Sequence, residues 1–350
     1  MKCLKVAVWK GGEAVRILGK LGLREFEFKI LRDNGFLLIP IKQAIANSDL
    51  EKVKEKIGFF EVVECETEKV EKRKTSIVEF LRGRIPEEML KLVPSSFDVV
   101  GHVAIIKIPE ELRGFEGLIG QALIETHKNI KTVLARETAV GGRFRLRGFR
   151  LVAGEDKTET FHRENGCIFF LDVKKAFFSP RLAGERLRVS GLVGEGETVV
   201  DMFAGVGPFS ILIAKRHRNV RVYAVDINPD AFSYLKKNIV LNRVEGKVLP
   251  ILGDIEVVAK EINGKIDRAI MNLPEDSFKH LKTAYRLLDG DGFIHFYCFE
   301  DEPNPIEKAS GKVREVVEGF GGNCKIVFGR LVKEIAPRRW MVGLDILLKN

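Results

Sequence analysis

Three short runs between residues 199 and 275 carry groups that could bind a nucleotide-type cofactor. The first, VVDMFAGVGPFS, is an apolar strand that enters a glycine turn at Gly205 and Gly207 and continues into a helix. The second, VYAVDINPDAF, is a strand that ends in Asp226, and the third is the tripeptide NLP at 272–274, which ends another apolar strand. Because open α/β sheets bind ligands at the carboxyl ends of their strands, this order predicts a cofactor site there.

The glycine turn departs in two places from the fingerprint of dinucleotide-binding proteins. That fingerprint has a third Gly or Ala three residues after the second glycine, where this chain has Ser210. Pro208 opens the following helix and removes an N–H group that a pyrophosphate would bind. Both departures argue against a nicotinamide dinucleotide. The pattern instead resembles the first motif of class I S-adenosylmethionine-dependent methyltransferases, and the matching residues are Asp201, Phe203, Gly205 and Gly207.

This resemblance implies a role for the groups at the strand ends. In such enzymes the glycine turn passes the methionine portion of the cofactor. The acid that ends the second strand, here Asp226, binds the two ribose hydroxyls. Asp254 matches the acid that binds the adenine amino group, and Ile227 and Asn272 complete the predicted cofactor contacts. The alternative is a Rossmann-like turn that binds no ligand.

The elements that must position these groups alternate strictly from residue 173 to residue 350. Apolar strands separated by helices of crossover length predict a mostly parallel α/β sheet. The resemblance implies that this sheet has the Rossmann-like class I methyltransferase fold. The expected strands are 198–202, 220–226, 247–252, 266–272 and 292–298. Residues 324–348 hold two β-rich runs with no helix between them, so we expect them to pair antiparallel at the sheet edge.

Two smaller α+β domains are expected before this sheet. Residues 1–66 alternate short strands and helices and include an Asn34-Gly35 turn that favours positive φ. The charged run 67–75 is a predicted linker that would let the first domain move independently. Residues 76–172 form the second expected domain, and 173–350 form the methyltransferase domain.

Arginines are concentrated in the second of these domains. FRLRGFRLV, residues 144–152, alternates apolar residues with arginines, which predicts a strand with Arg143, Arg145 and Arg147 on one face. Such a face could form the wall of a phosphate-binding groove, and the alternative is a solvated basic surface. The whole chain has a net charge of +9, from 58 Lys and Arg against 49 Asp and Glu, which is compatible with a polyanionic partner.

Composition bounds the class of protein further. No run reaches about 18 apolar residues, so no membrane-spanning segment is expected, and we expect a soluble, cytoplasmic monomer without a bound metal. The cysteines are odd in number and include no CxxC pair, which argues against a zinc site and against a disulfide framework. Free, buried thiols are therefore expected at Cys3, Cys65, Cys167, Cys298 and Cys324.

The order of several longer motifs resembles one family in particular. FRLRGFRLVAGED, TFHRENGCIFFLDVKKAFFSPRLAGERLRV, VVDMFAGVGPFSI, YAVDINPDAF, MNLP and APRRW occur in the order seen in archaeal and eukaryotic tRNA (guanine-37-N1)-methyltransferases. The likeness covers residues 97–350 and is weaker over the first 66, and FFSPRLAGER is its most specific segment. It implies S-adenosylmethionine as the methyl donor and a tRNA with guanosine at position 37 as the partner.

The resemblance also implies catalytic roles. Glu185, in FFSPRLAGER, would be the general base that takes the proton from guanine N1, and Arg145 would hold O6, where negative charge develops. Asn272 would orient the base edge and Pro274 would shape the pocket. Phe177 could stack on the base or pack near the cofactor, with core packing as the alternative. The remaining predicted substrate contacts are Arg143, Arg181 and Arg186.

Several alternatives stay open. Arg145 could contact phosphate alone, and Glu185 could pair with Arg181 or Arg188. Sister enzymes with this fold modify wyosine intermediates at the same nucleotide, by methylating carbon 7 of 4-demethylwyosine or by transferring an aminocarboxypropyl group. Glu275 departs from the family pattern at the edge of the target pocket and bears on this choice. A third interpretation is a basic RNA-binding protein that has lost catalysis.

Overall fold

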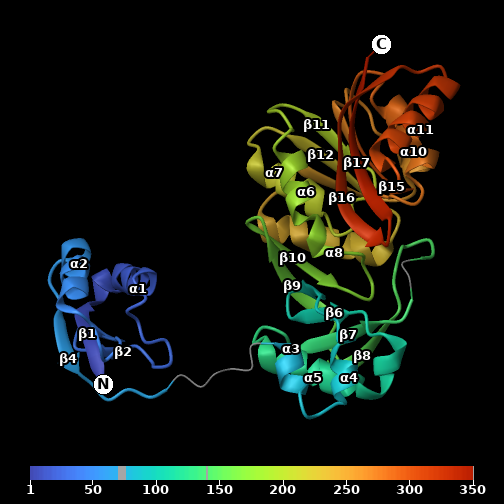
Figure 1. Ribbon diagram of the computed structural model, residues 1–350. Coiled ribbons are helices and arrows are strands. Elements are labelled where there is room, and N and C mark those ends of the chain that lie inside the picture. Colours follow the sequence, from blue (N-terminus) through green and yellow to red (C-terminus); the bar gives the residue numbers. More distant parts are fainter. Residues whose placement is uncertain (70–75, 139–140, 350) are drawn as a thin grey trace. The chain divides into compact units, whose positions relative to one another are not determined.

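The computed structural model describes residues 1–69, 76–138 and 141–349, and its elements are labelled in Figure 1. The chain divides into two compact units, Met1–Glu79 and Phe80–Asn350. The predicted linker at 67–75 lies largely outside the described residues, and the finer three-domain division stays a prediction. None of the described helices is long and apolar enough to cross a membrane.

The first unit packs an antiparallel sheet against two helices. The sheet has the order β2-β3-β1-β4, and its core includes Leu4, Ile39 and Val53. Its elements are β1 (Lys2–Ala7), η1 (Val8–Lys10), α1 (Gly11–Lys20), β2 (Leu31–Asp33), β3 (Phe36–Pro40), α2 (Asn47–Ile57) and β4 (Glu61–Glu64). The predicted turn joins β2 to β3, and Asn34 and Gly35 both have positive φ, 41° and 84°. That prediction is confirmed.

A disulfide joins Cys3 of β1 to Cys65, which directly follows β4. The two strands pair antiparallel, and the Cys65 backbone N–H donates to the Met1 carbonyl at 2.8 Å, so the two Cα atoms lie 6.2 Å apart. The prediction of free thiols is therefore wrong for this pair, because strand pairing brings together cysteines that are 62 residues apart in sequence. The described free cysteines are Cys167, Cys298 and Cys324.

The second unit opens with a small sheet of order β5-β6-β7-β8. Helix α5 packs on β7 and β8 and buries Ile119, Ala122 and Leu123. The elements are α3 (Ile77–Leu81), α4 (Glu87–Leu90), β5 (Asp98–Val100), β6 (Val103–Ile106), η2 (Glu110–Phe115), α5 (Glu116–Thr126), β7 (Thr132–Arg136) and β8 (Phe149–Gly154).

Strand β8 begins later than the arginine pattern predicts. Residues 142–145 form a turn, and Arg145 has a φ of 54°, in the left-handed region that non-glycine residues adopt rarely. Arg143, Arg145 and Arg147 therefore do not share one face of a strand, and that prediction is wrong. The apolar–arginine alternation is real, but Arg145 lies in this turn and pairs with two acids that are distant in sequence, Glu275 and Asp276.

A two-stranded ribbon, β9 (Glu159–Glu164) and β10 (Cys167–Asp172), connects to a helix of the main sheet. Asn238 and Asn242 of α8 (Pro229–Asn242) each bond to the backbone N–H and carbonyl of one residue in β10, at 2.6–3.1 Å. Two buried side-chain amides thus supply the hydrogen bonds that a neighbouring strand would otherwise make.

The main sheet has the order β13-β12-β11-β14-β15-β17-β16. Its strands are β11 (Thr198–Asp201), β12 (Arg221–Asp226), β13 (Val248–Leu252), β14 (Arg268–Met271), β15 (Gly292–Asp301), β16 (Cys324–Ala336) and β17 (Arg339–Leu348). Strands β11 to β15 pair parallel, whereas β17 pairs antiparallel with β15 and with β16. The predicted fold class and its antiparallel edge are confirmed.

Helices cover both faces of this sheet, so alternate residues of each strand enter two separate cores. Val199 and Val222 belong to a core that includes residues of α6, α7 and α8, while Val200 and Val225 belong to a core that includes residues of α9, α10 and α11. The helices are η3 (Pro180–Leu182), α6 (Ala183–Ser190), α7 (Pro208–Arg216), α9 (Ile255–Val258), α10 (Ser277–Leu287) and α11 (Pro305–Gly319). The strand order reverses between β11 and β14, which places a crevice at their carboxyl ends.

Candidate active site

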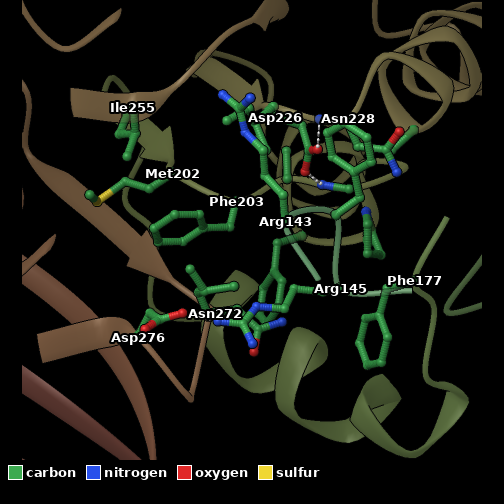
Figure 2. A pocket seen from close by; sticks show the side chains of 18 of the residues that line it. Arg143, Arg145, Phe177, Met202, Phe203, Asp226, Asn228, Ile255, Asn272 and Asp276 are labelled. Carbon is green, nitrogen blue, oxygen red and sulfur yellow. Dashed lines mark hydrogen bonds and ion pairs between the residues drawn. The ribbon is translucent and has the colours of Figure 1, made fainter. Parts of the chain in front are cut away.

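A cavity of about 390 Å³ lies at this crevice, and Figure 2 shows part of its lining. The segments that follow β11, β12, β13 and β14 form its floor. Residues 142–145, Phe177 and the segment around α6 contribute another wall. The predicted residues that line it are Arg143, Arg145, Phe177, Arg186, Phe203, Gly205, Asp226, Ile227, Asp254 and Asn272.

The glycine turn fixes the Asp226 carboxylate. Gly205 donates its backbone N–H to one carboxylate oxygen at 2.6 Å, and Asn228 donates to the other at 2.8 Å (Figure 2). Gly207 caps α7 with a φ of 88°, and a Cβ there would come within 2.5 Å of Leu235 Cδ1. Burial raises the pKa of Asp226. Each oxygen keeps a second lone pair, so the carboxylate can still accept two hydroxyl groups.

Asp201 does not line the cavity but lies beneath the turn. It is fully buried, and its Oδ2 accepts the Ser210 hydroxyl at 2.7 Å, which ties β11 to α7. Burial raises the pKa of Asp201 to about 7. Ser210, the residue that breaks the dinucleotide pattern, thus has a structural role: its hydroxyl donates to one oxygen of a buried acid, whose other oxygen has no partner among the described residues. Gly207 also lies outside the cavity lining and acts through the turn.

Near β13 the cavity combines an aromatic wall with polar groups. The His280 ring of α10 lies 5.1 Å from the Phe203 ring, and its Nδ1 lies 2.6 Å from the Glu256 carboxylate. Asp254 caps α9 by accepting the Glu256 backbone N–H at 3.0 Å. Sequence reasoning missed His280, because a single histidine on an amphipathic helix carries no motif.

Arg145 and the NLP tripeptide meet at one edge of the cavity. The two terminal guanidinium nitrogens of Arg145 donate to Glu275 and to Asp276, which directly follow the tripeptide. Asn272 and Asp276 line the cavity (Figure 2), whereas Pro274 is not among its lining residues. The structure therefore brings Arg145 beside Asn272 across a large separation in sequence. Asp276 was not predicted, since an acid at a helix start is commonly a cap.

Glu185 lies on α6 but outside the cavity lining. It is 3% exposed, and its Oε1 accepts the Tyr297 hydroxyl at 2.9 Å and two N–H groups of Arg188 at 2.7 and 3.0 Å. Its Oε2 is buried, lies 3.4 Å from the nearest Arg330 nitrogen, and accepts no hydrogen bond from the described residues. Arg188 also bonds Asp345 at 2.6 Å. Glu185 thus has one oxygen, beside Arg330, that takes no hydrogen bond from the described residues.

The other predicted substrate contacts differ in accessibility. Arg186 lines the cavity but is almost fully buried and donates to both Glu164 oxygens at 2.7 Å. Arg181 lies outside this cavity and pairs with Asp98 at 2.5 Å. Phe177 is 43% exposed, so it lines the cavity without being a core residue.

Comparisons with known proteins agree with this arrangement. A family model for the TRM5/TYW2 methyltransferase domain matches residues 160–327, and one for the TYW2 N-terminal domain matches residues 77–158. The tRNA (guanine(37)-N(1))-methyltransferase Trm5b of Pyrococcus abyssi is 43% identical over 342 residues, which cover 98% of this chain and 97% of the relative.

Solved structures extend the likeness to three dimensions. The structure described as the complex of aTrm5 and tRNALeu has a TM-score of 0.72 and 36% identity, with all of both chains covered. The Methanocaldococcus jannaschii TYW2 structure in complex with AdoMet has a TM-score of 0.54 and 29% identity, and covers 73% of this chain and 100% of that one. The chain belongs to the TRM5/TYW2 family of methyltransferases.

Proposed function

We propose that this chain transfers the methyl group of S-adenosylmethionine to N1 of guanosine 37 in tRNA. The observation that carries the proposal is one cavity that holds both the glycine turn with Asp226 and the Arg145–Asn272 edge. The whole-length likeness to Trm5b, the likeness to a Trm5 bound to tRNA and the likeness to a TYW2 bound to AdoMet support it.

The residues present fit the cofactor. Asp226 has acceptor capacity left for two ribose hydroxyls, and Asp254 and Phe203 form a polar and an aromatic wall for a base. S-adenosylmethionine supplies a methyl group already activated on a sulfonium sulfur. The protein then has to hold the acceptor atom in line with that group, which is a matter of positioning. All these residues come from one chain, so we propose that the enzyme acts as a monomer.

On the substrate side, guanine N1 must lose its proton before or during attack. The Arg145 guanidinium would stabilise the negative charge that develops at O6, and the Asn272 amide would hold the base edge. Arg145 is held by Glu275 and Asp276, so guanine O6 has to compete with these carboxylates or use a remaining N–H group. The target base must leave the stack of the anticodon loop to reach this edge.

Glu185 is the proposed general base, because its Oε2 has no hydrogen-bond partner among the described residues. Because Glu185 lies outside the cavity lining, the proposal requires its side chain to turn toward the base when RNA binds. Asp276 is the rival candidate, since its carboxylate already lines the cavity beside Arg145.

The function is tested by labelled methyl transfer to a tRNA transcript with G37 and to the same transcript with A37. We expect 1-methylguanosine from the first and no product from the second, with mass spectrometry of the digested nucleosides as the readout. No transfer to the G37 transcript contradicts the proposal. Product formed only on tRNA that carries 4-demethylwyosine would assign the chain to the wyosine pathway, which the TYW2 N-terminal match keeps as the second candidate.

The identity of the general base is tested by a matched pair of variants. Glu185→Gln is expected to lower the single-turnover rate by about 10² to 10⁴, with tRNA and cofactor affinities unchanged, because only proton transfer is removed. Asp276→Asn, which removes the rival carboxylate, is expected to keep a much higher rate. The reverse result would make Asp276 the base and leave the methyl-transfer reaction itself standing.

A further inference from the structure

A second cavity of about 190 Å³ lies beside the first within the second unit. The two cavities share Arg145, Phe177 and Phe178. Four more cations line it from separate elements, namely Arg136 at the end of β7, Arg147 before β8, Arg181 in η3 and Lys333 in β16. The function proposed above uses none of these four side chains.

The lining carries more positive charge than its carboxylates neutralise. Its acids are Asp98 and Glu334. Asp98 is already engaged by Arg136 and, at 2.5 Å, by Arg181. The Glu334 carboxylate accepts the Arg338 backbone N–H at 3.2 Å. Arg145 is paired with Glu275 and Asp276 outside this lining, so four cations remain against two lining acids, and the excess lies in a partly enclosed space.

Two of these cations have no counter-ion among the described residues. Among residues 1–69, 76–138 and 141–349, no carboxylate comes within ion-pair distance of Lys333 or Arg147. The Lys333 ammonium has one hydrogen-bond contact in this part of the chain, at 3.5 Å to the Ser179 hydroxyl. The Arg147 and Arg136 Nε atoms are buried without a partner there. Burial beside other cations lowers the pKa of Lys333 to about 8.

Enclosing unpaired cations costs stability, so such a cluster is expected where an anion binds. Guanidinium groups present planar N–H donors that match phosphate oxygens, and a lysine ammonium adds a point charge. An RNA strand that places its base in the first cavity and runs on past Arg145 and Phe177, which both cavities share, would reach the second cavity. The anion that this path brings to the second cavity is a phosphodiester.

We propose that the second cavity binds a backbone phosphodiester next to the target nucleotide, with Lys333 and Arg147 as its ligands. This inference rests on the proposed function, because it takes the base in the first cavity as the anchor of the strand. It assigns to Lys333, which no motif marks, the role of a substrate-binding residue.

The first test compares Lys333→Ala with Lys265→Ala, whose lysine is 76% exposed and lies 3.5 Å from Asp267. Affinity for a G37 tRNA transcript is measured between 50 and 200 mM salt. Loss of one phosphate contact is expected to reduce the slope of log K against log salt by about 0.7 for Lys333→Ala alone. Over that range the wild-type affinity should then fall about 2.6-fold more than that of the variant. Lys333→Arg is expected to restore the slope.

The second test neutralises the RNA in place of the protein. Transcripts are assembled with a single uncharged methylphosphonate linkage on the 5′ or the 3′ side of G37. Wild type is expected to lose about tenfold in affinity for one of the two, the effect of one charge-assisted hydrogen bond. Lys333→Ala should lose clearly less for that transcript, because Arg147 is then the one proposed ligand that remains.

The possible failures are distinguishable. Equal salt slopes for wild type and Lys333→Ala, or equal sensitivity of both proteins to each methylphosphonate, would overturn the phosphodiester site. Methylation of G37 by both proteins would in that case leave the proposed function intact. Failure of the wild type to methylate any G37 transcript would instead contradict the proposed function.

Discussion

Replacing Lys333 by Met should stabilise the protein while it weakens RNA binding. The side chain of Met has a similar length but no charge, so the substitution removes an unpaired ammonium from a partly enclosed, cationic cavity. The charged groups that act on Lys333 come from neighbouring elements: Asp98 attracts it, and Arg147, Arg181 and Arg186 repel it. A merely solvated surface lysine would show no such gain.

The size of the effect follows from the lowered pKa. A lysine whose pKa falls from 10.5 to about 8 on folding destabilises the native state by about 3 kcal/mol when it is charged. Contact with solvent screens part of this, so we expect a gain of about 1 to 2 kcal/mol for Lys333→Met. For a unit of this size the gain corresponds to a rise in Tm of about 2 to 8 °C.

The pH dependence provides the check. Below about pH 8 the ammonium is charged in both states, so the cost to the native state is fully present. Between pH 8 and 10.5 the folded protein loses this proton first, so wild-type stability rises with pH relative to Lys333→Met. Above 10.5 both states are neutral and the two proteins should converge.

The assay is denaturant unfolding of the full chain at pH 7, 9 and 11, with Lys265→Met as the control for loss of a surface lysine. A destabilised Lys333→Met, or a stability gain that is the same at pH 7 and pH 11, would refute the reasoning. Either result would mean that the Lys333 ammonium is paired with an anion and exposed to water in solution.

Other perturbations test the turn, the acid and the first unit. Reducing the disulfide, or replacing Cys3 and Cys65 by Ser, should destabilise the first unit by about 4 kcal/mol, because a loop of about 60 residues is released. Identical unfolding curves with and without reductant would contradict the presence of the disulfide. Gly207→Ala should lower the free energy of unfolding by about 1 to 3 kcal/mol and weaken cofactor binding, because the φ of Gly207 is 88° and the added Cβ meets Leu235. Thermal unfolding measures the first effect and calorimetry the second. Asp226→Asn should lower cofactor affinity at least about tenfold, because the single amide oxygen cannot replace the two carboxylate oxygens that accept the Gly205 and Asn228 N–H groups. Unchanged affinity would exclude Asp226 from the ribose site.

The main sheet could be predicted from the sequence because its signals are local. Each parallel strand is an apolar run, and the helices between them have crossover length, so order and direction follow from general rules of α/β folds. The glycine turn is equally local. Gly205 and Gly207 take positive φ, and Asp226 ends its strand where it meets the Gly205 N–H. These features depend on residues within one βαβ unit.

What could not be predicted depends on contacts between distant segments. The alternation in 144–152 indicates a strand, yet Arg145 bonds to Glu275 and Asp276, 130 and 131 residues away, and the chain turns there instead. The disulfide likewise depends on the pairing of β1 with β4, which cysteine spacing does not reveal. Lys333 carries no motif at all, because its meaning comes from the arginines that tertiary structure places around it.

Arg145 lines both cavities, so its ion pairs affect both base binding and phosphate binding in the proposed reaction. Its backbone conformation is one that arginine adopts rarely, so the ion pairs with Glu275 and Asp276 must compensate for that cost. A guanine O6 in the first cavity and a phosphate in the second would both draw on the same guanidinium. The two acids after the tripeptide therefore set how readily Arg145 turns to RNA, and a residue other than Glu at position 275 would shift that balance toward the substrate. The departure from the family pattern at position 275 thus affects how readily Arg145 binds the substrate, as well as which target nucleobase the enzyme modifies.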